Sequence, residues 1–175
     1  MGLKKDKPVE VVKKDKMLDE KIHDPYMVKG MYSDPTICPT CGLVFHNKTW
    51  KKDPKLLEKV KKEKDVEYKD CPACRKIKDN YPLGLLIIQG EVLNNPEKVR
   101  EVMSLVKHEE EKEQVSNPLA RVMKIENLED RIEISTTTEG LATRLGKALN
   151  KAHQGNLEFI FSDNDKFLRV IWKKD

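Results

Sequence analysis

Four cysteines are the residues of this sequence whose type and spacing could do chemistry. They form two pairs, CPTC at residues 38–41 and CPAC at residues 71–74, with two residues between the members of each pair. A turn of this length lets two thiolates reach one metal ion, and four thiolates on two such turns are typical of a tetrahedral zinc site. The sequence therefore predicts one Zn²⁺ bound by Cys38, Cys41, Cys71 and Cys74.

Redox dithiols or disulfides are the alternative for the same cysteines, because each CxxC motif alone could be thioredoxin-like. The presence of two copies, the lack of a βαβ pattern around them and the lack of a secretory signal favour zinc. Four protein ligands leave no open position for water or substrate. The predicted zinc is therefore structural rather than catalytic.

A second stretch, residues 136–155, looks briefly like a phosphate-binding loop, because Gly140 is followed by Gly146 and Lys147. A Walker loop has four residues between its first glycine and the Gly-Lys pair, and a Ser or Thr after the lysine. Here five residues intervene, and Ala148 stands where the magnesium-binding hydroxyl belongs. We therefore expect no bound nucleotide.

The same stretch has the pattern of an amphipathic helix, which Thr138 can cap and Gly155 can end. A regular helix uses the backbone amides that a phosphate loop leaves free. We find no nucleophile–base pair elsewhere in the sequence, and we expect the protein not to be an enzyme. The apolar stripe of this helix consists of Leu141, Leu145, Ala148, Leu149 and Ala152.

Basic side chains occupy the opposite face of this predicted helix and also surround a tryptophan between the cysteine pairs. Such groups can contact the phosphates of structured RNA, and ordinary solvation of a surface is the alternative. The tryptophan is expected to face the partner. The candidate RNA-binding residues are Lys48, Trp50, Lys51, Lys52, Arg144, Lys147 and Lys151.

Charge is abundant and unevenly distributed along the chain. Charged residues make up 37% of the 175 residues, against roughly 25% in an average domain. The net charge is +6 over residues 1–82, −4 over 83–138 and +2 over 139–175. Two basic ends thus flank an acidic middle, which suits an anionic partner such as RNA.

No apolar run is long enough for a membrane span. The longest, LGLLII at residues 83–88, is too short to cross a bilayer. The first residues carry charge without the apolar segment of a secretory signal. We expect a cytoplasmic protein without a membrane partner.

The elements that must position the candidate residues are predicted from turn residues and periodicity. Residues 1–30 lack a periodic apolar face and are expected to form a flexible basic tail. Residues 31–93 are expected to form a zinc ribbon with an inserted lysine-rich arm and a following strand over 81–93. Residues 94–175 are expected to form an α-β-β-α-β-β domain, with helices on one face of an antiparallel sheet. The predicted fold class is α+β.

Boundaries inside the second domain follow from local signals. Asn95 can cap the first helix with Pro96 at its first position, and that helix is expected to end near residues 116–118. A hairpin is expected to turn at residues 128–130. The last two strands are expected over 156–162 and 166–174.

The order of these motifs carries a family resemblance. They are CPTCGLVF, CPAC, YPLGLLIIQGEVL, ISTTTEGLATRLGKALNKAHQGNLEF and DKFLRVIW, within residues 34–173. The sequence resembles a family of small prokaryotic zinc-ribbon proteins, which is similar in turn to the amino-terminal region of the adaptor that exports the large ribosomal subunit from the nucleus. The resemblance implies a zinc module joined to an α+β domain that associates with RNA or the ribosome. It does not imply the export function.

Residues and resemblance together predict a non-catalytic zinc-binding protein that associates with RNA, foremost ribosomal RNA or a ribosomal subunit. The alternative is a protein-interaction or regulatory module. In that case the acidic helix over 96–115 is the docking face and no nucleic acid is bound.

Overall fold

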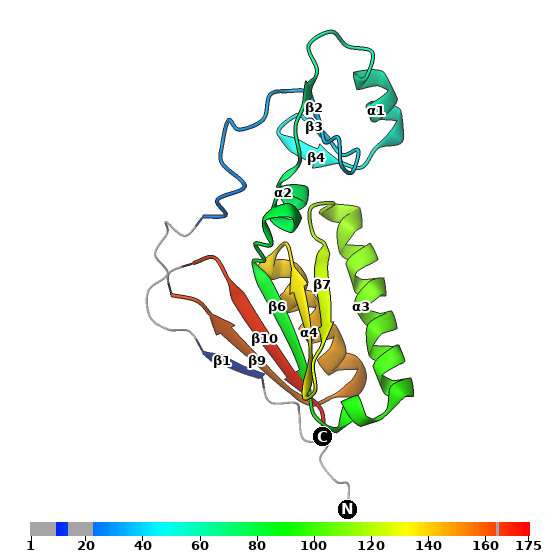
Figure 1. Ribbon diagram of the computed structural model, residues 1–175, viewed down its shortest axis with the longest axis vertical. Helices are drawn as coiled ribbons and strands as arrows, with labels where there is room; N and C mark the ends of the chain where they lie inside the picture. Colours follow the sequence, from blue (N-terminus) through cyan, green and yellow to red (C-terminus); the bar gives the residue numbers. More distant parts are fainter. Residues whose placement is uncertain (1–9, 14–22, 164) are drawn as a thin grey trace, which may run out of the picture.

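The protein has a mixed α+β architecture with two sheets, seen in a computed structural model that describes residues 10–13, 23–163 and 165–175 (Figure 1). A small part at one end of the molecule holds the cysteines and a four-stranded sheet. A larger part holds a six-stranded sheet and the two longest helices of the described residues. The predicted α+β fold class is confirmed.

The small part is built from short strands in the order β4-β3-β2-β5, and helix α1 (Pro54–Val60) follows β4. Asp53 caps α1 with its side chain. The apolar face of α1 packs on the strands in a cluster of Ile37, Val44, Leu56, Leu57, Val60 and Val66. The strands are β2 (Thr36–Ile37), β3 (Val44–His46), β4 (Thr49–Lys51) and β5 (Glu67–Tyr68).

Helix α2 (Pro72–Asp79) leads from the small part into strand β6 (Gly84–Gln89) of the large sheet. The strand expected over residues 81–93 is therefore shorter than predicted. The chain turns at Gly90, whose φ of 99° favours glycine, and continues as the 3-10 turn η1 (Glu91–Asn94).

The large sheet has the strand order β1-β9-β10-β6-β8-β7. From α3 onward the elements follow the predicted α-β-β-α-β-β order. The expectation of a purely antiparallel sheet is wrong, because β6 pairs with β10 in parallel and β1 pairs with β9 in parallel. Long crossover connections separate both pairs in the sequence, as parallel pairing requires. The other strands are β1 (Glu10–Lys13), β7 (Val122–Asn127), β8 (Arg131–Thr136), β9 (Asn156–Phe161) and β10 (Leu168–Lys173).

Helices α3 (Pro96–Ser116) and α4 (Glu139–His153) pack against one face of this sheet. Asn95 and Thr138 cap them as predicted, each accepting from backbone amides of the first turn. In the part of the chain that the structure describes, no helix combines the length and the apolar character that a membrane span needs. The shared core includes Val102, Val106, Leu141, Leu145, Leu149, Leu86, Ile134, Val170 and Trp172.

The predicted tail over residues 1–30 falls largely on residues 1–9 and 14–22, which lie outside those that the structure describes. Its described residues contact the rest of the protein. Residues 10–13 form β1 and pair with β9 at the edge of the large sheet. Asp24 forms an ion pair with the buried Lys76 of α2.

Candidate metal centre and the surfaces around it

The first cysteine pair lies on a tight turn between β2 and β3. The amide of Gly42 donates to the carbonyl of Cys38 at 2.9 Å, and the amide of Cys38 donates to the carbonyl of Leu43 at 2.9 Å. Gly42 has a φ of 77°, so the backbone twist that follows the pair uses the freedom of glycine. These bonds turn the side chains of Cys38 and Cys41 toward the same side.

The second cysteine pair lies at the start of α2. Cys71 is the N-cap, and its Sγ accepts from the amide of Cys74 at 3.4 Å. Pro72 occupies the first helical position, where its missing amide costs no hydrogen bond. The first turn of the helix thus places both sulfurs of this pair at one end of α2.

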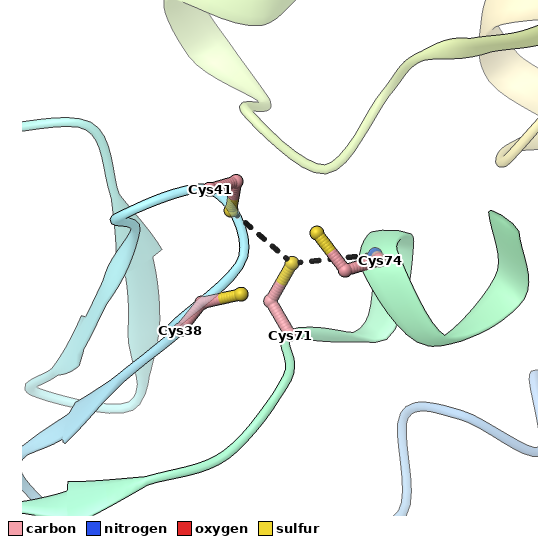
Figure 2. Close-up of side chains that lie close together, drawn as sticks. All are labelled: Cys38, Cys41, Cys71 and Cys74. Atoms are coloured by element: carbon pink, nitrogen blue, oxygen red, sulfur yellow. Dashed lines mark hydrogen bonds between the residues drawn. The ribbon is translucent and has the colours of Figure 1, made fainter. Parts of the chain in front are cut away.

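The four sulfur atoms converge, as Figure 2 shows, and all lie within 4.8 Å of one another. Cys41 Sγ and Cys71 Sγ are 3.7 Å apart, which is well beyond a disulfide bond of about 2.05 Å. All four cysteines are free. The predicted convergence of Cys38, Cys41, Cys71 and Cys74 is confirmed, and the cluster could hold one metal ion.

The thiols of the cluster do not ionise equally. A hydrogen bond from Cys71 and, to a smaller degree, the contact with Arg121 lower the pKa of Cys41 to about 4. The same contact with Cys41 raises the pKa of Cys71, and burial raises the pKa of Cys74 to about 11. One thiolate is therefore favoured here, whereas additional thiolates need a positive charge among the sulfurs.

Two charged residues outside the CxxC motifs surround the sulfurs. Asp70, just before α2, accepts from Thr40 Oγ1 at 2.6 Å and from Lys78 in the last turn of α2, so it links the first cysteine turn to this helix. Arg121 donates to Cys41 Sγ at 3.2 Å and to Cys74 Sγ at 3.4 Å. Arg121 lies just before β7 in the larger part. It is far from both cysteine pairs in the sequence, so no local pattern predicts this contact.

Trp50 does not face a partner, contrary to the expectation from the sequence. Its side chain is only 7% exposed and packs beside the cysteines. Tyr32 meets it edge-on with ring centroids 4.9 Å apart, and Phe45 lies at 5.4 Å. The aromatic residue thus supports the core of the cysteine part and offers little surface to a base.

The basic ridge expected on α4 is smaller than predicted. Arg144 forms ion pairs with Glu109 at 2.8 Å and with Glu113 at 2.9 Å, so its charge holds α4 against α3. Lys147 and Lys151 are exposed. Lys147 lies over the ring of Phe159, with Nζ 5.8 Å from the centroid.

Residues 47–64 of the cysteine part are rich in lysine. Of the lysines predicted to contact RNA here, Lys48 and Lys52 are exposed and Lys51 is half-buried. The outer face of α1 adds the exposed Lys55 and Lys59, and the turn after α1 adds the exposed Lys62. None of the three was predicted from the sequence. Their spacing of four and three residues, opposite the apolar face of α1, was the available signal. The lysine face consists of Lys48, Lys51, Lys52, Lys55, Lys59 and Lys62.

Three of the six acidic residues of α3 make contacts inside the protein. Glu109 and Glu113 pair with Arg144. Glu110 accepts from the amide of Val122 at 2.8 Å and from Gln114 at 3.2 Å. These contacts weaken the alternative in which α3 is an acidic docking face.

Comparison with protein-family models found no match, and a search of curated proteins found none either. The relation to the prokaryotic zinc-ribbon family stays a prediction that rests on the motifs quoted above.

Proposed function

We propose that the cysteine part is a zinc ribbon and that Cys38, Cys41, Cys71 and Cys74 hold one structural Zn²⁺. A tetrahedral zinc with Zn–S bonds of about 2.3 Å keeps its sulfurs about 3.8 Å apart. The separation of 3.7 Å between Cys41 and Cys71 supports this assignment. Four thiolates also match the soft ligand set that zinc accepts in closed structural sites.

We further propose that the zinc ribbon presents its lysine face to RNA, so that the protein is a non-catalytic RNA-associated factor. The observation that carries the proposal is the charge of this segment. Residues 47–64 contain eight lysines and three acidic residues, a net charge of +5. Among the described residues, only Lys61 of these lysines forms an ion pair, with Glu58. Within the described chain, the members of the lysine face therefore form no ion pair.

Rigidity of the support strengthens this assignment. The apolar face of α1 is fixed on β2 and β3 by Val60, which is 1% exposed. Lys55 and Lys59 consequently project from a packed helix, and Lys62 from the turn directly after it. Phosphate contacts from such lysines supply affinity without base specificity. The resemblance described above makes ribosomal RNA the first RNA to test.

The test is a fluorescence titration of labelled ribosomal RNA fragments with the full zinc-loaded chain, repeated at several salt concentrations. Each lost phosphate contact reduces the slope of log K against log salt by about 0.7–0.9. We expect the K55Q/K59Q/K62Q variant to lose about two to three units of slope. The K147Q/K151Q variant removes two exposed lysines of α4 and is expected to keep the slope.

Two results would contradict the proposal. Wild-type binding that does not change with salt would exclude a phosphate-contacting surface. A loss of slope in K147Q/K151Q but not in the α1 variant would move the RNA surface to α4. In either case the cysteine part would serve stability alone.

A further inference from the structure

Arg121 makes a polar contact between the candidate metal centre and the larger part of the molecule. Its guanidinium bridges Cys41 of the first cysteine pair and Cys74 of the second, at 3.2 and 3.4 Å. The Nε atom of the same side chain donates to the carbonyl of Pro118 at 3.2 Å. The fork of the guanidinium is therefore aimed at two sulfurs at once, a geometry that a lysine cannot reproduce.

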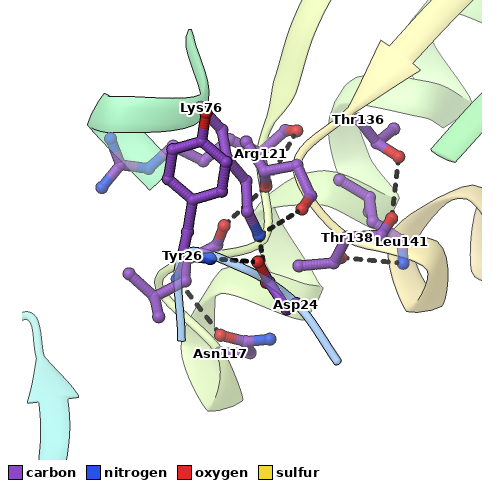
Figure 3. A network of polar contacts seen from close by, with 10 residues as sticks. Asp24, Tyr26, Lys76, Asn117, Arg121, Thr136, Thr138 and Leu141 are labelled. Atoms are coloured by element: carbon purple, nitrogen blue, oxygen red, sulfur yellow. Dashed lines mark hydrogen bonds and ion pairs between the residues drawn. The ribbon is translucent and has the colours of Figure 1, made fainter. Parts of the chain in front are cut away.

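The backbone of Arg121 is fixed as firmly as its side chain. Its amide donates to Thr137 Oγ1 at 2.8 Å, and the amide of Thr137 donates back to the Arg121 carbonyl at 2.9 Å. The carbonyl of Thr137 also accepts from the buried Lys76 of α2 at 3.0 Å. Figure 3 shows this network where α2 meets the loop between α3 and β7. Arg121 is thus held by the larger part while it reaches into the cysteine part.

Charge explains why the cysteine pairs need such a residue. Four thiolates around a divalent ion leave a net charge of about −2. Positive hydrogen-bond donors beside the sulfurs offset that charge and orient the ligands. Among the described residues, Arg121 is the only arginine or lysine with a hydrogen bond to a cysteine sulfur.

Apolar contacts alone do not fill the junction between the cysteine part and the six-stranded domain. Leu119 packs against the cysteine cluster. A groove of about 680 Å³ nevertheless remains beside it, lined by residues that include Met27, Met31, Pro72 and Pro118. Polar contacts must therefore contribute to fixing how the two parts sit on each other.

We propose that Arg121 is a positioning residue of the metal centre, which couples metal binding to the docking of the cysteine part on the six-stranded domain. A metal ion that holds the four thiolates together stabilises the hydrogen bonds from Arg121 to the sulfurs. These hydrogen bonds in turn raise the affinity of the thiolates for the metal. This reciprocity is required for any two coupled equilibria. The inference rests on the proposed zinc site but not on RNA binding.

The test measures zinc affinity by competition with a chelator and backbone hydrogen exchange by mass spectrometry, both on the full chain. We expect Arg121→Met to lower zinc affinity by about 10–100-fold. Arg121→Lys, which keeps the charge without the fork, is expected to lie between Arg121→Met and wild type. Arg100→Met removes an exposed arginine of α3 and is the matched control, with affinity unchanged.

Hydrogen exchange separates positioning from a general loss of stability. In wild type, removal of zinc is expected to speed exchange at residues 117–121 and 27–32, while the centre of the large sheet stays protected. In Arg121→Met the same two segments are expected to exchange fast even with zinc bound. The inference would be overturned if Arg121→Met bound zinc as tightly as wild type. It would also be overturned if hydrogen exchange at residues 117–121 and 27–32 did not change when zinc is removed from wild type. A wild-type chain that binds no zinc would overturn the zinc site as well.

Discussion

Arg144 lies between two carboxylates of the neighbouring helix, and its charge is used to pack α4 on α3. Burial alone would raise the pKa of Glu109, but Arg144 and Lys112 outweigh it, so the pKa lies below the ordinary value of 4.5. A carboxyl group with a lowered pKa stabilises the fold above its unfolded pKa. That contribution is lost as the pH falls through the folded pKa.

We therefore predict that Arg144→Met destabilises the protein by about 0.5–1 kcal/mol at neutral pH, because the pair is partly exposed. The difference in unfolding free energy from wild type should shrink below the ordinary carboxyl pKa, since a protonated Glu109 has no charge to pair with the arginine. Urea unfolding of both proteins at neutral and at strongly acidic pH measures this. Lys98→Met, which removes an exposed pair with Glu101 at 3.1 Å, is the control and should change stability little at either pH. An equal loss from Arg144→Met at both pH values would show that the arginine acts through packing rather than charge.

At the scale of elements, helix α4 approaches the sheet closely because Gly146 has no side chain. An added Cβ there would lie 2.5 Å from Val170 Cγ1 and 3.1 Å from Leu157 Cδ1. Val170 is β-branched and fully buried, so it has little freedom to move away. Gly140, in the first turn of the same helix, has nothing within 4 Å of such a Cβ.

The two glycines give a matched pair of substitutions. We predict that Gly146→Ala destabilises the protein by about 1–3 kcal/mol, since overpacking outweighs the gain in helix propensity. Gly140→Ala should stabilise it by up to about 1 kcal/mol, because alanine restricts the unfolded chain without a clash. Chemical denaturation of both variants gives the comparison. Equal effects of the two substitutions would mean that α4 does not sit on the sheet as closely as described.

Local signals explain which elements were predictable from the sequence. The caps Asn95 and Thr138 and the spacing of the cysteines act over a few residues, so α3, α4 and the cysteine turns could be placed. The parallel pairing of β6 with β10 joins residues about eighty positions apart, which no local pattern reveals. Arg144 and its partners are 31 and 35 positions apart, and Arg121 lies 80 positions from Cys41. No local pattern reveals these contacts either.

At the scale of the whole molecule, charge is divided between the two parts. The lysine face lies on the small part, at the opposite end from the carboxyl terminus (Figure 1). In the larger part, Arg144, Glu109 and Glu113 pair with one another between α3 and α4. Such a division suits a protein that offers one basic end to an RNA while a separate core stabilises the chain.

Both the proposed RNA surface and the role of Arg121 depend on the four cysteines, so the most direct test is native mass spectrometry of the full chain purified without added metal. The account predicts one zinc ion per chain, lost on chelation and on Cys71→Ser substitution, with four free thiols in the metal-free protein. A chain that carries no metal and instead contains disulfides between these cysteines would contradict it.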